Sequence, residues 1–148
     1  MTALTSPHPV PWRVFLVTIL IVSVWVNASE VARYFLLVMP AMREMLAVIP
    51  DVAPMNLPVF LIWGLWDTLL VLMAVVIYWL VAERFGPTLR TAVGAGTLAF
   101  LFFFVLFWVG TWNMNLAEGW LLPLVLPWAW IEMVVACLIA RWSFWRFG

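Results

Sequence analysis

Residues 59–81 read VFLIWGLWDTLLVLMAVVIYWLV, and this stretch decides the fold class. A helix needs about 20 mainly apolar residues to cross the hydrocarbon core of a bilayer. Residues 59–81 meet that length, and Asp67 is their only charged member. The stretch therefore predicts a transmembrane α-helix that carries one carboxyl group well inside it.

Three further apolar stretches have a similar length. They cover residues 14–36, 91–112 and 120–140, so the chain has four predicted spans. Of its 148 residues, 68% are hydrophobic and 9% are charged, whereas a soluble domain carries about 25% charged residues. We therefore predict an all-α membrane protein, with residues 1–148 forming a single domain that folds as a four-transmembrane-helix bundle.

The first connection between spans is rich in proline, beginning with Pro40. Proline removes a backbone donor and disfavours helix in the residue before it, so we expect the first span to end near this point. Residues 41–49 nevertheless carry apolar side chains at helical spacing. They predict either a short amphipathic helix on the outer membrane surface or a continuation of the first span.

The arginines predict the orientation of the bundle. Five of them flank one side of the four-helix layout, namely Arg13, Arg84, Arg90, Arg141 and Arg146. Cytoplasmic flanks are enriched in basic residues, so we expect both chain ends in the cytoplasm. All basic residues are arginine and none is lysine, a usage typical of GC-rich bacterial genes. The expected location is therefore a bacterial inner membrane. A cleaved signal peptide ending at the small residues 26–28 is the alternative for the N-terminus.

Several kinds of chemistry lack the residues that they need. The only histidine is His8, in the polar N-terminal tail, so no span supplies imidazole to a haem or a metal ion. Without lysine there is no Schiff base, and Cys137 is a lone cysteine. The formal net charge of zero gives no attraction to nucleic acid. We expect no cofactor, no metal site and no nucleic-acid partner.

Four charged residues lie inside the predicted spans, where each costs on the order of 3 kcal/mol near the bilayer centre. They are Glu30, Arg33, Asp67 and Glu132. Glu30 and Arg33 are three residues apart, so they occupy adjacent turns of one helix and are expected to pair. Asn27 forms one polar stripe with Ser23, Glu30 and Tyr34, and it is expected to orient the charged groups. We expect the three acids to share one cavity at outer or middle depth.

Tryptophans flank the two deeper acids. They are Trp63 and Trp66 beside Asp67, and Trp128 and Trp130 beside Glu132. Arg33 can neutralise one carboxylate, and the other two must either hold a proton or meet a cation from outside. Indole faces attract cations. The pattern therefore predicts a ligand-binding site, although buried polar groups also serve simply as hydrogen bonds between helices.

The function that these residues favour is binding or transport of a lipophilic or cationic small molecule within the membrane. Transport would require a homodimer, because four helices rarely enclose a complete path. A structural or accessory subunit of a larger membrane complex is the first alternative, with the apolar run 98–109 as a face for lipids or a partner. A membrane-embedded acid–base isomerase is the second alternative, since two carboxyl groups in an apolar site can exchange protons with a substrate.

Overall fold

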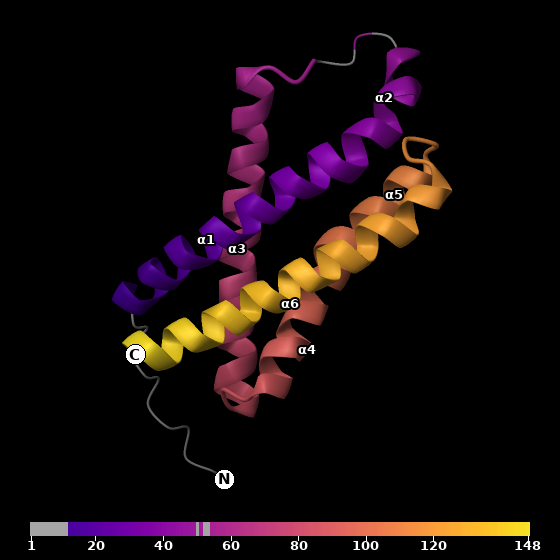
Figure 1. Cartoon of the computed structure of the whole chain (residues 1–148). Helices are drawn as coiled ribbons and strands as arrows, with labels where there is room; N and C mark the ends of the chain where they lie inside the picture. The colour runs from indigo at the N-terminus through magenta and orange to yellow at the C-terminus, as the bar shows by residue number, and fades with distance from the viewer. Residues whose placement is uncertain (1–11, 50, 52–53) are drawn as a thin grey trace.

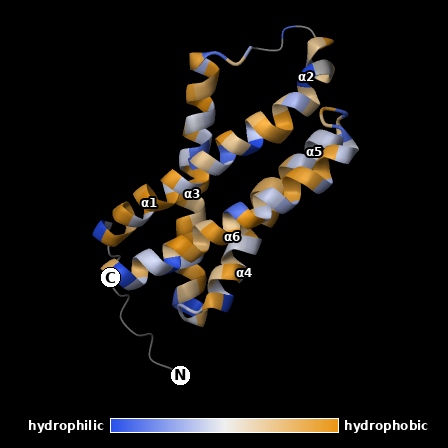
Figure 2. Ribbon diagram, in the orientation of Figure 1, coloured by the Kyte–Doolittle hydropathy of each residue, from blue (hydrophilic) through white to orange (hydrophobic). Residues whose placement is uncertain are grey.

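A computed structural model describes residues 12–49, 51 and 54–148, and His8 lies outside them. Within these residues the chain is helical and has no strand. Four helices are long and apolar enough to cross a membrane, judged by length and composition: Trp12–Arg43, Leu57–Phe85, Leu89–Asn113 and Gly119–Phe147. The predicted all-α fold with four spans is thereby confirmed. Figure 2 shows the helices largely hydrophobic, with hydrophilic residues at their ends and a few within α1 and α6.

The first helix continues through Pro40, so the expected break at this proline is wrong. Helix α1 (Trp12–Arg33) passes into the π-helical turn η1 (Tyr34–Val38) and then into α2 (Met39–Ala47). The N–H of Met39 donates to the carbonyl of Tyr34, five residues back. This wider turn directly precedes Pro40. In a regular α-helix the proline ring would clash with the carbonyl four residues earlier, and the π-helical turn makes room for it. Residues 39–47 therefore prolong the first helix rather than form a separate helix in the loop.

The second span is α3 (Leu57–Phe85), and it extends beyond the predicted 59–81 at both ends. Asn56 caps its start by accepting a hydrogen bond from the Val59 N–H at 3.1 Å. Its end lies at Gly86, whose φ of +82° belongs to the left-handed region that glycine adopts without strain. The helix therefore ends at Phe85, within the gap between the second and third predicted spans.

The third and fourth spans are also longer than predicted. The third consists of α4 (Leu89–Phe100), the π-helical turn η2 (Leu101–Val105) and α5 (Leu106–Asn113). The fourth begins with the 3₁₀ turn η3 (Gly119–Leu121) and continues as α6 (Leu122–Phe147), well past the expected end at residue 140. Helix N-termini tolerate proline, which is why Pro123 lies in the first turn of α6.

The helices pack around α6. Helices α1 and α6 lie side by side and run in opposite directions, with α4 and α5 behind them and α3 crossing at a steeper angle (Figure 1). Helix α3 contacts α1, α4 and α6. The tightest packing uses small and β-branched residues, which let helix backbones approach closely. Those with no exposed surface include Val22, Val26, Val71, Val75, Ala92, Ala95, Ala129 and Ala136.

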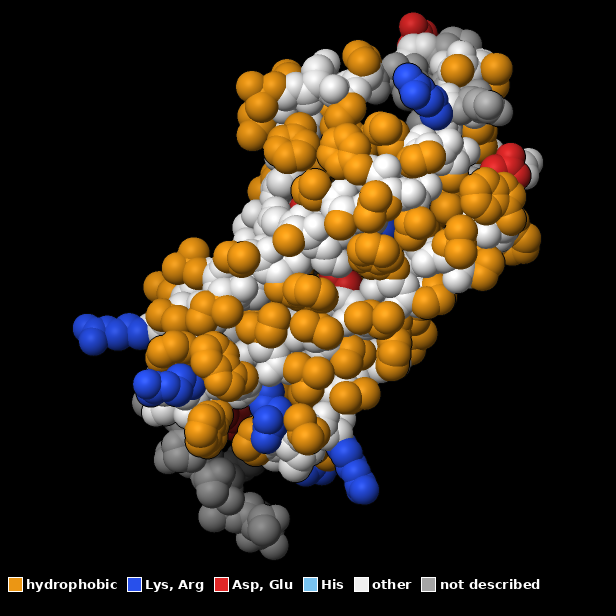
Figure 3. All heavy atoms as spheres, viewed as in Figure 1, with side chains coloured by type: hydrophobic (Ala, Val, Ile, Leu, Met, Phe, Trp, Pro, Cys, Tyr) orange, Lys and Arg blue, Asp and Glu red, His pale blue; other side chains and the backbone are white. Residues whose placement is uncertain are grey.

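The arginines named above gather at one end of the bundle, which we call the arginine end. Figure 3 shows most of the basic side chains projecting from the lower part of a surface rich in hydrophobic side chains, with one further basic side chain near the top. Each lies at a helix terminus: Arg13 in the first turn of α1, Arg84 in the last turn of α3, Arg90 at the start of α4, and Arg141 and Arg146 near the end of α6. The opposite end, which we call the outer end, carries the connections at residues 48–56 and 114–118.

Candidate functional site

Three helices bring the four predicted charged residues together inside the bundle. Arg33 on α1, Asp67 on α3 and Glu132 on α6 are all buried, with exposed fractions of 6%, 8% and 0%. Glu30 lies one turn before Arg33 and is half-buried. The charges of Glu30 and Arg33 act on both Asp67 and Glu132, so the four side chains form one electrostatic unit. We call these four residues the charged cluster.

Arg33 is held on two sides. Its Nη2 donates to Glu30 Oε1 in the ion pair that the three-residue spacing predicts. Its guanidinium lies over the ring of Phe104, 4.5 Å from the centroid, where the negative face of the aromatic ring attracts the cation. Its Nη1 is buried and has no hydrogen-bond partner among the described residues. The one basic group of the cluster therefore still has a donor to offer.

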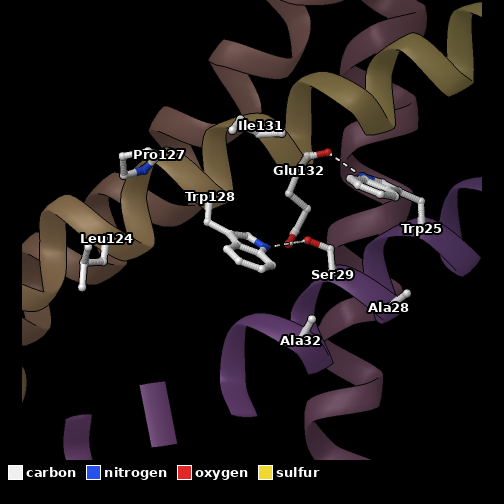
Figure 4. Close-up of a pocket in the computed structure, with 9 residues that line it drawn as sticks. All are labelled: Trp25, Ala28, Ser29, Ala32, Leu124, Pro127, Trp128, Ile131 and Glu132. Carbon is white, nitrogen blue, oxygen red and sulfur yellow. Dashed lines mark hydrogen bonds between the residues drawn. The ribbon is translucent and has the colours of Figure 1, made fainter. Parts of the chain in front are cut away.

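Glu132 has one satisfied oxygen and one unsatisfied oxygen. Ser29 Oγ donates to Glu132 Oε2 at 2.5 Å, and Trp128 Nε1 donates to the same Ser29 oxygen at 3.0 Å (Figure 4). Trp25 Nε1 donates to the backbone carbonyl of Glu132 at 3.0 Å. Glu132 Oε1 is buried and has no partner within the described part of the chain. A buried acceptor without a donor costs free energy. A proton or a ligand that bound to this oxygen would remove that cost.

Glu30 and Glu132 are two of the three carboxyl groups of the charged cluster, and the charge of Glu30 acts on Glu132. Two ionised carboxylates are both acceptors, so they form a hydrogen bond only when one of them carries a proton. Three carboxyl groups face one guanidinium in this cluster, which leaves negative charge to be compensated. A proton shared by Glu30 and Glu132, or a cation from outside, would supply that compensation.

A hollow of about 580 Å³ lies along the seam between α1 and α6, directly above Glu132. We call it the seam groove. Its walls are almost entirely apolar apart from Ser29 and Glu132, and its members are Trp25, Ala28, Ser29, Ala32, Leu124, Pro127, Trp128, Ile131 and Glu132 (Figure 4). A second hollow of about 410 Å³ shares Leu124 with it and reaches Trp120 and Pro40 toward the outer end. Together they give Glu132 an apolar approach along the side of the bundle.

Several residues expected at the site lie elsewhere. Asn27 donates to the carbonyl and the hydroxyl of Ser23 on its own helix, at 2.8 and 3.0 Å, rather than to an acid. Trp130 is 40% exposed and donates to Thr97 on α4. Trp63 and Trp66 are 46% and 42% exposed. Of the four predicted tryptophans, Trp128 lies nearest to the predicted role, because it hydrogen-bonds to Ser29, which in turn donates to Glu132.

Three residues of the site did not follow from the sequence. Trp25, Ser29 and Arg33 follow one another at intervals of four and share a face of α1. This face lies next to the predicted polar stripe that contains Asn27 and Glu30. Phe104 belongs to the apolar run predicted as a face for lipid or a partner, yet it is 4% exposed and covers Arg33. Helical spacing from Arg33 could have identified Ser29 and Trp25, whereas only the packing of η2 against α1 reveals Phe104.

Small residues on α6 near Glu132 lie on a packed face of this helix. Ala129, Ala136 and Ala140 have no exposed surface. Gly96 on α4 is buried against α6, whereas Gly94, also on α4, is exposed. Helix α6 is thus closely packed against α4, and the seam groove is an opening between α6 and α1.

Within residues 12–49, 51 and 54–148, no three histidine, cysteine, aspartate or glutamate side chains are placed to hold one metal ion. Compared with known proteins, the chain matches no family model, no curated protein and no solved structure. The residues of the charged cluster and the seam groove therefore carry the functional interpretation by themselves.

Proposed function

We propose that this chain is a polytopic membrane protein that binds a lipophilic organic cation in the seam groove, with Glu132 as the group that recognises the charge. One observation carries the proposal. Glu132 is fully buried, one of its carboxyl oxygens has no donor among the described residues, and it is one of the residues that line an apolar hollow of about 580 Å³. Buried ionisable groups in membrane helices are expensive and commonly mark ligand or ion sites.

The excess of acids favours a cationic ligand. Glu30, Asp67 and Glu132 surround Arg33, whose Nη2 is already paired with Glu30. An ammonium group at Glu132 Oε1 would give this oxygen a charge-assisted hydrogen bond or ion contact and offset the remaining negative charge. A neutral or anionic ligand would leave that charge uncompensated.

The walls of the groove favour a lipophilic ligand. Trp25 and Trp128 present indole rings, and Leu124, Pro127 and Ile131 supply aliphatic surface. The indoles can face a cation while the aliphatic residues contact its hydrocarbon part. Both hollows are lined by residues of α1, η1, α2, η3 and α6 on the outer side of Trp25 and Glu132, so the groove supports binding from the membrane rather than passage through the bundle.

In the same proposal, the arginine end lies in the cytoplasm of a bacterial cell and the four helices span its inner membrane. Basic residues are retained on the cytoplasmic side of membrane helices, and five of the seven arginines lie at this end. The seam groove would then open toward the outer half of the bilayer.

Ligand binding by the full chain in lipid nanodiscs tests the proposal. The probes are a long-chain alkyl trimethylammonium ion and its neutral tert-butyl counterpart, and quenching or shift of tryptophan fluorescence reports occupancy. We expect the cation to bind and Glu132→Gln to weaken it by about tenfold or more, a loss of about 1.4 kcal/mol. The amide keeps an acceptor for Ser29, so the fold should survive.

Glu118→Gln is the matched control, because Glu118 is exposed in the connection before η3. It should leave cation binding unchanged. Equal binding of the cationic and neutral probes, or full affinity in Glu132→Gln, would contradict the assignment of Glu132 as the recognition group.

A further inference from the structure

The outer part of α3 has no neighbour within the described chain that buries it. No residue from 57 to 66 is buried, whereas Asp67, Leu70 and Val71 on the next turns are. Figure 1 shows this end of α3 separated from α1 and α5, while its lower part crosses the bundle. We call residues 57–66 the free segment of α3. Its large side chains are apolar and 42–68% exposed, as in Leu57, Phe60, Leu61, Ile62, Leu65 and Trp66.

The free segment continues a helix face that is packed lower down. Phe60, Trp63 and Gly64 lie at helical spacing above Asp67, Val71 and Ala74. Val71 and Ala74 are 0% and 1% exposed, while Phe60 and Trp63 are 49% and 46% exposed. A Cβ added at Gly64 would meet nothing within 4 Å, so the space beside it is open. The same face thus changes from buried to bare where Asp67 lies.

Asp67 lies in a cluster that is short of positive charge. It is 8% exposed, no hydrogen bond to it is present within the described residues, and the guanidinium of Arg33 is the one basic group among the three carboxyl groups of the cluster. The position of Asp67 is about 15 Å from Leu57 at 1.5 Å per residue. A helix lying along the free segment with a basic side chain at that depth would meet Asp67 and cover the apolar surface together.

A second copy of this chain cannot provide the basic side chain. The chain has no lysine, and all seven of its basic residues are arginines. Five lie at the arginine end, Arg43 is exposed near the outer end of α2, and Arg33 is buried against Glu30 and Phe104. A basic side chain that reaches Asp67 from a neighbouring helix would therefore belong to a different protein.

We propose that the free segment of α3 docks a transmembrane helix of a different membrane protein, and that this helix carries a lysine or arginine that pairs with Asp67. The apolar side chains of the segment supply the packing surface, and Gly64 lets the partner backbone approach closely. The carboxylate fixes the depth of the partner in the bilayer, because a buried charge is compensated only when its counter-charge lies at the same level. This inference is independent of ligand binding in the seam groove.

A model peptide in lipid vesicles provides the test. A leucine-rich transmembrane peptide carries one lysine about 15 Å below its outer end, matched to Asp67 by helical rise. It also carries an acceptor dye, and energy transfer from the tryptophans of the full chain reports association. Two comparison peptides carry glutamine in place of the lysine, or the lysine near the opposite end. We expect the matched lysine peptide to bind about tenfold more tightly than either.

Asp67→Asn should remove that preference, while Glu118→Gln should keep it, because Glu118 is an exposed acid outside the charged cluster. Should Asp67→Asn fail to fold, the comparison of the three peptides on the unaltered chain decides by itself. Equal affinity for lysine and glutamine peptides would overturn the proposal. An absence of binding by every peptide would also overturn it, because lipid would then cover the segment. Self-association of the labelled chain that excludes the peptides would overturn it as well.

Discussion

At the scale of single residues, Arg33 carries the charge balance of the site. Its guanidinium is buried between Glu30 and Phe104, and it faces three carboxyl groups. Arg33→Ala should destabilise the protein by about 3–5 kcal/mol, because removal of one partner leaves buried charge without compensation. The measurement is reversible unfolding in detergent.

Arg43→Ala is the control for this substitution, since Arg43 is exposed on α2 and its loss should change stability little. Adding Glu30→Gln to Arg33→Ala should restore part of the lost stability by removing one uncompensated carboxylate. Unchanged stability in Arg33→Ala would show that the guanidinium is not needed for charge compensation.

The site could be predicted from the sequence where interactions are local. The pairing of Glu30 with Arg33 follows from their spacing on one helix. Glu132 and Asp67 stood out because charges are rare in apolar spans. The contacts of Ser29 with Glu132 and of Phe104 with Arg33 depend on how each helix is rotated about its axis relative to its neighbours. Ser29 and Glu132 are 103 residues apart in the sequence. Helical spacing alone does not determine that rotation.

At the scale of elements, Gly96 controls the contact between α4 and α6. A Cβ at this position would lie 2.6 Å from Val134 Cα and 2.7 Å from the carbonyl oxygen of Met133, so the backbones would have to separate. Gly96→Ala should destabilise the fold by about 1–3 kcal/mol through overpacking. Thermal unfolding in detergent measures this change.

Gly94→Ala is the matched control on the same helix, because a Cβ there meets nothing within 4 Å. Alanine is also the better helix former by about 1 kcal/mol. Gly94→Ala should therefore leave stability unchanged or raise it. Equal effects at the two glycines would mean that close approach of α4 and α6 is not what Gly96 provides.

The number and positions of the spans could be predicted more reliably than their lengths. Hydrophobic runs identified all four spans, and the two later connections lie in the gaps between the predicted runs. Pro40 misled the prediction because the π-helical turn η1 absorbs the proline and lets the helix continue. The bare outer part of α3 was not predictable, since residues 57–66 are as apolar as residues of a packed helix and only the packing shows that nothing covers them.

At the scale of the whole molecule, the charge distribution divides the bundle into two ends. Arg141 Nε donates to the carbonyl of Pro87 at 2.9 Å, so the arginine end joins α6 to the turn between α3 and α4. The outer end has exposed Asp51 and Glu118 and one exposed arginine, Arg43. In a bilayer, a bundle with this charge asymmetry would be retained with its arginine end on the cytoplasmic side.

Reporter fusions check that orientation in cells. A reporter active only in the cytoplasm, fused after Gly148 or inserted in the turn at Gly86, should be active, because both positions lie at the arginine end. The same reporter within residues 114–118 should be inactive, and a reporter active only outside the cytoplasm should give the reverse pattern. Matching signals at Gly148 and residues 114–118 would rule out a bundle of four spans with these ends. A complete reversal of all three would keep the four spans and place the seam groove in the cytoplasmic half of the membrane, so that its ligand would enter from the inner leaflet.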